Sequence, residues 1–410
     1  MERIDCKALD DACPLAWTRE RFDLPDDLLY FDGNSLGVLP AGAASDIAQT
    51  VTEEWGQGLI RGWLEADWFT LARRAGDALA PIIGAAEGEI VLTDSTSVNI
   101  FKLCAALMKQ SGTRKHVLME KDNFPTDGYI LEGIIDLLGR GHKLQIVPRA
   151  EIESALTENA ALALLTHVNY RTGEMFDMAE LTRSCRSVGV PVVWDLCHSA
   201  GAVPLQLNDW DVDYAVGCTY KFLNGGPGST SYAYISRSAL EGFSPVITGW
   251  FSHANQFGFE EGYREADSIN KMQVGTPQVL SLRGAFNGIM SYTDVSMESV
   301  RDKSLKLSSL FIELAEERLS HHGFDLASPR DAKKRGSQIS FYHDEGYAIC
   351  QALIARNVIP DYREPRILRF GITPLYMRYV DVWDCVDIIA DIMEAGSWRA
   401  FRSSPKSAVT

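Results

Sequence analysis

Residues 218–228 read CTYKFLNGGPG, and this stretch decides the fold class. It begins at the end of an apolar run, residues 213–218, that is typical of a short buried strand, and it places Lys221 just beyond that strand. Lysine ammonium groups are strongly hydrated and usually lie on the surface, so Lys221 marks either an ordinary turn or an amine that attacks a carbonyl. The glycines that follow would let the backbone pass close to a bulky ligand. Taken alone, the ordinary turn is the simpler interpretation.

On both sides of this stretch, short apolar runs alternate with longer segments of helical periodicity. The runs predict strands at residues 89–93, 116–120, 144–148, 161–168, 191–196, 213–218 and 231–235. Helical spacing predicts helices at residues 97–108, 126–138 and 177–188. This alternation is typical of an α/β fold, in which a mostly parallel sheet is covered by helices. Such sheets bind ligands at the carboxyl ends of their strands.

The pattern changes near residue 281. A long helical stretch, continuous or broken, is expected at residues 282–319, followed by a smaller α+β segment that ends near residue 394. We therefore expect three parts: an N-terminal segment, 1–45, that packs with the small domain, a large domain, 46–285, and a small C-terminal α+β domain, 286–410. The last residues, 397–410, are polar and are expected to fray.

Composition excludes several classes of protein. The 410 residues include 39 Lys+Arg and 55 Asp+Glu, a net charge of −16, so neither nucleic acid nor an anionic membrane surface is an expected partner. Residues 1–17 carry charged side chains where a signal peptide needs an apolar core, and no apolar run is long enough to span a membrane. The eight cysteines form no C-x-x-C pair, and the eight histidines show no metal-ligand spacing. We expect a cytoplasmic protein without a metal site.

Asp195 ends the predicted strand at residues 191–196 and precedes Lys221 by 26 residues. A buried carboxylate is costly unless it is paired, and the protonated ring nitrogen of pyridoxal phosphate is one suitable partner. His198 is close enough in sequence to support either the carboxylate or such a cofactor. Asp195 as the cap of a following helix explains the sequence equally well.

Two further loops follow predicted strands. Residues 94–99 read DSTSVN, and the hydroxyls of Thr96 and Ser97 at a helix start suit a phosphate, although a plain helix cap is common. Residues 122–127 read DNFPTD, where Phe124 could stack on a planar ring and Asp127 could position a base or a water. An ordinary loop before a helix is the alternative for this second stretch.

Arg369 lies within the apolar run at residues 367–372. An arginine in such a run needs a carboxylate or phosphate partner, and its planar fork suits the α-carboxylate of an amino acid. An internal ion pair with Asp or Glu is an equal alternative.

Together these positions resemble the fold-type I pyridoxal-phosphate enzymes of the aminotransferase class V group. No G-x-G-x-x-G follows an early strand and no P-loop motif occurs, which argues against a nucleotide enzyme. Within the group the chain resembles the kynureninase family, in its bacterial form, from about residue 15 to about residue 390. The resemblance lies in YFDGNSLG (30–37), NFPTD (123–127), VNYRTG (168–173), WDLCHSAG (194–201), TYKFLNGGPG (219–228), GWF (249–251) and LRFG (368–371).

The resemblance implies a large domain with a seven-stranded, mostly parallel sheet between helices, and a smaller α+β domain. It implies a hydrolase of tryptophan catabolism that cleaves the Cβ–Cγ bond of L-kynurenine to anthranilate and L-alanine, and 3-hydroxykynurenine less well. The implied cofactor is pyridoxal 5′-phosphate, bound as a Schiff base to Lys221. The implied assembly is a homodimer with shared active sites.

The resemblance also implies roles for single residues. The catalytic residues would be Lys221, Tyr220, Asp127 and Asp195. The cofactor would be bound by Thr96, Ser97, Phe124, Pro125, Thr126, Asp127, Thr166, Asp195, His198, Tyr220 and Lys221, with Trp250 and Thr276 reaching the phosphate in the neighbouring subunit. The substrate would be bound by Arg369, which clamps its carboxylate, and by Trp63 and Asn34. Trp63 together with Gly275 and Thr276 resembles the bacterial form, which favours kynurenine over its 3-hydroxy form.

Three other interpretations remain. Cysteine desulfurases have this fold, but they resemble one another in carrying His before the lysine and a reactive Cys on a late flexible loop. Here Tyr220 precedes Lys221, and Cys350 lies in a predicted helix at residues 347–356. A class V aminotransferase is also consistent with the fold, but the Tyr-Lys and Trp-Asp motifs favour the kynureninase family. A non-catalytic scaffold would have no reason to keep Lys221, Asp195 and Arg369 together.

Overall fold

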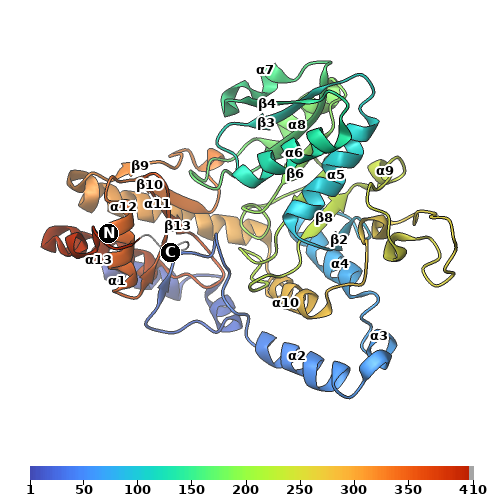
Figure 1. The fold of residues 1–410 in the computed structure, drawn as a ribbon. Helices are drawn as coiled ribbons and strands as arrows, with labels where there is room; N and C mark the ends of the chain where they lie inside the picture. Colours follow the sequence, from blue (N-terminus) through green and yellow to red (C-terminus); the bar gives the residue numbers. More distant parts are fainter. Residues whose placement is uncertain (406–410) are drawn as a thin grey trace.

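The computed structural model describes residues 1–405, and it contains two hydrophobic cores, one on each main sheet (Figure 1). The larger sheet has seven strands in the order β2-β8-β7-β6-β5-β3-β4. Every neighbouring pair is parallel except the two pairs made by β8, so the expected mostly parallel α/β sheet is confirmed. The strands are β2 (Ile90–Leu92), β3 (His116–Glu120), β4 (Lys143–Val147), β5 (Ala160–Thr166), β6 (Val192–Asp195), β7 (Tyr214–Gly217) and β8 (Tyr232–Ile235).

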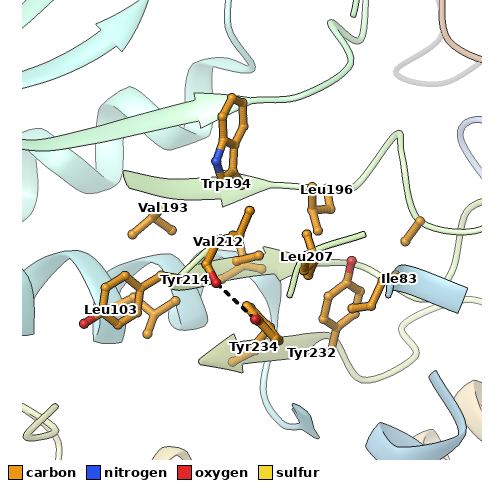
Figure 2. Close-up of a cluster of buried hydrophobic side chains, with 14 of the residues drawn as sticks. Ile83, Leu103, Val193, Trp194, Leu196, Leu207, Val212, Tyr214, Tyr232 and Tyr234 are labelled. Atoms are coloured by element: carbon orange, nitrogen blue, oxygen red, sulfur yellow. Dashed lines mark hydrogen bonds between the residues drawn. The ribbon is translucent and has the colours of Figure 1, made fainter. Parts of the chain in front are cut away.

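The central strands are mostly apolar, as expected for a sheet whose two faces are covered by helices, and only their last residues, such as Thr166 and Asp195, are polar. All seven residues of β5 are buried, and so are all four of β6. Figure 2 shows Val193 and Trp194 on opposite sides of β6, as the pleat requires. The helices of this domain are α4 (Leu71–Ile83), α5 (Thr96–Gln110), α6 (Pro125–Leu138), α7 (Ile152–Ala155), α8 (Met178–Ser187), α9 (Arg237–Leu240) and α10 (Val279–Met290).

Two of the differences between the predicted and the observed helices have a local cause. Helix α6 begins at Pro125 rather than at residue 126, because a proline in the first turn has no N–H that needs a partner. The stretch at residues 282–319 is two helices, α10 and α11 (Met297–Leu319). The break is stabilised by Ser296, whose side chain accepts a hydrogen bond from the backbone N–H of Ser299 at the start of α11 (3.1 Å).

The smaller sheet is antiparallel, in the order β12-β13-β10-β9. Its strands are β9 (Asp325–Leu326), β10 (Gln338–Tyr342), β12 (Asp361–Arg363) and β13 (Ile367–Gly371), and it packs with α11, α12 (Gly346–Ile354) and α13 (Tyr379–Ala395). The N-terminal chain joins this part of the molecule. Strand β1 (Leu29–Tyr30) pairs in parallel with β11 (Val358–Ile359), and Asp10 of α1 (Arg3–Asp11) caps α13 by accepting from the N–H of Tyr379 (2.7 Å).

The expectation of a frayed C-terminus is wrong for part of the segment. Residues Ser397–Phe401 form a short 3-10 helix, and Trp398 is buried in the smaller core. Trp398 and the partly buried Phe401 anchor this segment on the smaller core. Residues 406–410 lie outside the described residues.

One part of the chain projects from the body of the molecule. Helix α2 (Ala43–Gln49) and the short helix α3 (Gly62–Glu65) extend below the large domain in Figure 1. Their segment exposes large apolar side chains, with Ile60 and Leu64 at 78% and 81% exposure. Separately, no helix within residues 1–405 is long and apolar enough to span a bilayer.

Candidate active site

Lys221 lies in a tight turn four residues beyond β7, at the carboxyl ends of the parallel strands. Backbone hydrogen bonds hold the turn: the N–H of Asn224 donates to the Lys221 carbonyl (2.9 Å), and the N–H of Gly37 donates to the Tyr220 carbonyl (2.7 Å). A Cβ on Gly37 would overlap the Lys221 carbonyl oxygen, so glycine is required where the N-terminal segment crosses this turn. The turn that presents the amine is therefore fixed from two distant parts of the chain.

His198 is the direct partner of this amine. Its Nε2 lies 2.9 Å from the Lys221 Nζ, and its ring is 4% exposed. Burial and the adjacent Lys221 hold the pKa of His198 well below its ordinary value, so the imidazole is neutral at neutral pH. If Nε2 accepts from the Lys221 ammonium, the ring proton lies on Nδ1, which is buried and has no hydrogen-bond partner.

Asp195 ends β6 and lies in register with Thr166 of β5 and Val216 of β7. One carboxylate oxygen accepts a hydrogen bond from the N–H of Cys197 (2.8 Å). Asp195 therefore does cap the residues that follow it, but these form a turn rather than the helix that the alternative interpretation required. The side chain is 5% exposed and remains at the strand end beside the Lys221 turn.

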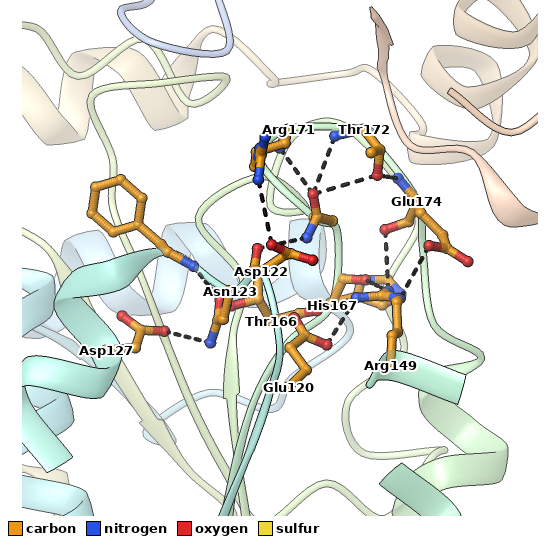
Figure 3. Close-up of polar contacts among 12 residues, drawn as sticks. Glu120, Asp122, Asn123, Asp127, Arg149, Thr166, His167, Arg171, Thr172 and Glu174 are labelled. Atoms are coloured by element: carbon orange, nitrogen blue, oxygen red, sulfur yellow. Dashed lines mark hydrogen bonds and ion pairs between the residues drawn. The ribbon is translucent and has the colours of Figure 1, made fainter. Parts of the chain in front are cut away.

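Asn123 connects the predicted ring-binding loop to the sheet (Figure 3). Its Oδ1 accepts from the Thr166 hydroxyl, and its Nδ2 donates to Asp127 (3.2 Å). Asp127 is 2% exposed, and burial together with the nearby Asp195 raises the pKa of its carboxyl well above the ordinary value. Phe124 is different, because it is 45% exposed and its ring lies perpendicular to that of Tyr170 (5.3 Å between centroids).

The predicted phosphate loop is the start of α5. Ser95 is the N-cap and accepts from the N–H of Val98 (3.4 Å), so a plain cap is present. The Thr96 hydroxyl lies 2.9 Å from that of Ser231, and Ser97 is half-buried beside it. Hydroxyls at the first turn of a helix, with N–H groups that have no intrahelical partner, can bind an anion.

Arg369 of β13 is 2% exposed and has several partners. It donates to the Tyr170 carbonyl (2.5 Å) and the Ser35 hydroxyl (3.2 Å) and forms an ion pair with Asp361. The internal ion pair, which was one of the two interpretations of Arg369 from the sequence, is thus present. The Arg369 Nε has no hydrogen-bond partner. Burial lowers the pKa of Arg369 to about 10, which still leaves it protonated at neutral pH. Asn34, next to Ser35, is fully buried, donates to Gln338 (3.1 Å) and has an unpartnered side-chain oxygen.

Trp63 and Trp250 belong to a separate aromatic cluster. Trp63 packs against Phe69 (5.1 Å between centroids), which stacks on Phe251 (6.0 Å), and Trp250 packs edge-on against Phe251 (4.8 Å). Trp250 is 41% exposed and Thr276 is also exposed. The structure therefore groups a half-buried Trp63 with the exposed Trp250.

The residues at the strand ends fit a pyridoxal phosphate. An amine, a strand-end carboxylate, helix-start hydroxyls and N–H groups match the aldehyde, the ring nitrogen and the phosphate of that cofactor. The unpartnered Nδ1 of His198 is a buried donor that calls for a further polar group. Within residues 1–405, His, Cys, Asp and Glu side chains form no group of three that could hold a metal ion.

The sequence interpretation assigned no role to several residues of this site. Asn123 stands in the NFPTD stretch, which could have indicated it. Ser231 is 135 residues from Thr96, and Asp361 lies on a different strand from Arg369, so nothing in the local pattern points to either. A cavity of about 690 Å³, lined in part by Arg149, Phe176 and Trp210, contains none of the predicted site residues.

Comparison with known proteins gives the following relatives. A family model described as the kynureninase C-terminal domain matches residues 300–389. Proteins named kynureninase from Burkholderia pseudomallei (strain 1106a) and Pseudomonas fluorescens are each 45% identical to this chain, covering 100% of it and 99% of their own length. Apo cysteine desulfurase from Thermococcus onnurineus NA1 superposes with a TM-score of 0.78 at 17% identity, over 93% of this chain and 98% of its own. A variant of C-DES with glycine covalently linked to its PLP cofactor also gives 0.78, at 19% identity, over 91% and 99%. At these identities the two structures show the fold alone.

Proposed function

This chain belongs to the kynureninase family, and from that membership we propose how its residues carry out the reaction. The chain is a pyridoxal-phosphate-dependent hydrolase that uses water to cleave the Cβ–Cγ bond of L-kynurenine, with anthranilate and L-alanine as products. The observation that ties this activity to one site is the 2.9 Å contact between Lys221 and the neutral His198, beside Asp195 at the end of β6.

The cofactor, when bound, supplies an electron-withdrawing ring that stabilises negative charge on the substrate carbons next to the amine. Lys221 would bind its aldehyde, and Asp195 would face its ring nitrogen. Phe124 would stack on the ring, and Pro125, Thr126, Asp127 and Thr166 would complete its surroundings. Thr96, Ser97 and Tyr220 would bind the phosphate.

Three side chains handle protons. The Lys221 amine takes the proton from the substrate Cα, and the neutral Nε2 of His198 accepts a hydrogen bond from it, which keeps the amine oriented. The adjacent Cys218 and burial raise the pKa of Tyr220, so its phenol stays protonated and serves as an acid. Asp127 keeps its proton more strongly than an ordinary carboxyl because it is buried near Asp195.

Arg369 binds the substrate carboxylate. The negative charge of Asp361 is shared with Arg363 (3.2 Å), so the pair does not neutralise Arg369 completely. The unpartnered Arg369 Nε and the unpartnered oxygen of Asn34 are available for the amino-acid end of the substrate. Trp63 sets the preference for kynurenine, and 3-hydroxykynurenine reacts less well.

The enzyme acts as a homodimer in the cytoplasm. Exposed apolar side chains such as Trp55, Leu64 and Phe259 (56%, 81% and 79%) are more than a single chain normally leaves in water, and a second copy would cover them. Trp250 and Thr276 then reach the neighbouring cofactor phosphate. All eight cysteines are unpaired, which supports a reducing compartment.

The test is an assay of the purified protein with pyridoxal phosphate and L-kynurenine, in which anthranilate is followed by its fluorescence and alanine is quantified. We expect equal amounts of both products, no turnover by Lys221→Ala, and full turnover by Lys109→Ala, which removes an exposed lysine of α5. A yellow protein that releases no anthranilate would support the cofactor site but show that L-kynurenine is not the substrate.

A desulfurase activity is not favoured. Cys350, the late cysteine, lies inside α12 and is fully buried, and burial raises the pKa of its thiol to about 12. A thiol that is both inaccessible and protonated cannot accept sulfur from a cysteine substrate.

A further inference from the structure

Lys102 is a buried lysine directly below the phosphate loop. It lies on α5, is 0% exposed, and its ammonium forms an ion pair with Asp94 (2.5 Å). The same ammonium donates to the Met272 carbonyl (2.6 Å). A lysine is almost never fully buried unless it is paired, so these two contacts account for its position.

Asp94, the partner of Lys102, lies at the start of the predicted phosphate loop. It stands immediately before Ser95 and Thr96, in a left-handed backbone conformation (φ 50°) that turns the chain from β2 into α5. Its carboxylate also accepts from the Thr93 hydroxyl (2.9 Å), and its carbonyl accepts from the N–H of Ser231 (3.0 Å), whose hydroxyl contacts Thr96. A negative charge is therefore built into the start of an anion-binding loop.

The second contact of Lys102 joins this loop to the segments that bear Trp250 and Thr276. Met272 ends the short helix Ile269–Met272 and leads directly into residues 273–276. A Cβ on Gly249 would overlap the Val274 carbonyl oxygen, so the segment that begins with Trp250 lies against the same stretch. Lys102 thus lies between the loop of Thr96 and the segments of Trp250 and Thr276.

We propose that Lys102 is a positioning residue for the cofactor phosphate: it neutralises Asp94 and fixes the loop, so that a phosphate dianion at Thr96 and Ser97 is not repelled. The inference rests on the proposed function, since it concerns the same cofactor. An ionised Asp94 without its partner would repel a phosphate dianion. When Asp94 is paired with Lys102, the two charges cancel, and the phosphate is attracted by the helix N–H groups and the hydroxyls.

The experiment compares pyridoxal phosphate with pyridoxal, which has the same aldehyde and no phosphate. Each protein is freed of cofactor, and the dissociation constants of both aldehydes are measured from the absorbance of the bound form. The ratio of the two constants isolates the phosphate contribution. A general loss of structure would weaken both ligands and leave this ratio unchanged.

We expect Lys102→Met to reduce the preference for pyridoxal phosphate by about tenfold or more, as a nearby unneutralised charge should. Asp94→Asn should keep the wild-type preference or increase it. The double variant Asp94→Asn/Lys102→Met should regain most of the preference that Lys102→Met alone loses. Lys303→Met is the matched control, because this buried lysine of α11 donates to the Pro374 carbonyl (2.7 Å) and lies on neither the loop nor the Met272 segment.

The proposal is overturned if Lys102→Met keeps the wild-type preference, or if the double variant is as weak as Lys102→Met alone. If Lys102→Met does not fold, Asp94→Asn is a separate test. A reduced preference of Asp94→Asn for pyridoxal phosphate over pyridoxal would contradict the proposal, which expects an equal or increased preference. A wild-type protein that binds neither aldehyde would overturn the proposed function itself, and that outcome is distinct from a changed ratio.

Discussion

At the scale of single residues, the site depends on buried charges that are held by one another. Arg369 and Asp361 are 2% and 0% exposed and face each other across β12 and β13, where they lie in register. Such a pair adds little net stability, but removing one partner leaves the other charge buried and unpaired. What the pair provides is a guanidinium with a fixed direction, which a carboxylate-binding site requires.

We expect Arg369→Lys to raise the KM for L-kynurenine by about tenfold or more, because an ammonium keeps the charge but cannot form the planar fork. Steady-state kinetics would measure this change. Arg363→Lys is the control, since Arg363 contacts the same Asp361 carboxylate (3.2 Å) but is 37% exposed at its side chain. Equal KM values for the two variants would contradict the role of Arg369.

Glu120 is a second buried charge, at the end of β3 (Figure 3). It is 0% exposed, pairs with Arg149 (2.9 Å), and burial raises its pKa to about 7 from an ordinary 4.5. Between these two values the folded state holds a proton that the unfolded state has lost. The stability that Glu120 contributes is therefore complete below about pH 4.5 and is lost as the pH rises through 7.

We expect Glu120→Gln to remove the pH-dependent loss of stability that ionisation of Glu120 causes. The free energy of unfolding of the variant, relative to wild type, should rise by about 3 kcal/mol between pH 4.5 and pH 8. Urea unfolding at several pH values would measure it. Parallel pH profiles for the two proteins would show that Glu120 is ionised throughout.

At the scale of elements, the Lys221 turn is held by the N-terminal segment. Gly37 donates to the Tyr220 carbonyl (2.7 Å), and Ser35 and Asn34 of the same segment reach Arg369 and Gln338. One short segment thus contacts both the Lys221 turn and the strand that bears Arg369. In the proposed reaction its position would set the distance between the two ends of the substrate.

We expect Gly37→Ala to lower kcat by about a hundredfold, because its Cβ would overlap the Lys221 carbonyl oxygen and shift the amine. Kinetics and the absorbance of bound cofactor would separate loss of rate from loss of binding. In Gly133→Ala, on α6, the new Cβ meets no atom within 4 Å. This control should gain about 0.5–1 kcal/mol of stability at unchanged kcat. Full activity of Gly37→Ala would show that the turn tolerates displacement.

At the scale of the whole molecule, the two cores are covered, but the projecting segment is not. The aromatic cluster of Trp63, Phe69 and Trp250 continues into exposed Phe257 and Phe259, beside the segment that bears Leu64. In the proposed homodimer a second copy would cover this surface and bring its own Trp250 and Thr276 to the site.

We expect Leu64→Glu to give a folded monomer with little activity, because Leu64 is 81% exposed and supports no core of its own chain. Sedimentation would measure the mass. Leu137→Glu, at a 70% exposed position of α6, should remain dimeric and active. A dimeric and active Leu64→Glu protein would exclude this surface as the interface.

Much of the fold was predictable because hydrophobic periodicity is local. The strand predicted at residues 116–120 is β3 itself, and the one predicted at residues 161–168 ends two residues later than β5. The positions of Lys221 and Asp195 after their strands follow from the same pattern, as does the edge of the sheet at which they meet. The boundary errors are also local, since Pro125 and Ser296 decide where helices begin.

The sequence by itself therefore determined the strands of the large sheet, the edge at which Lys221 and Asp195 meet and, through its motifs, the family. The tertiary structure decided the partners: Ser231 for Thr96, Asp361 and Ser35 for Arg369, and Met272 for Lys102. The reason is that periodicity reports which face of an element is buried, whereas the group that meets a buried charge depends on how distant segments cross. Between Ser35 and Arg369 that separation is 334 residues, and only the folded chain brings the two together.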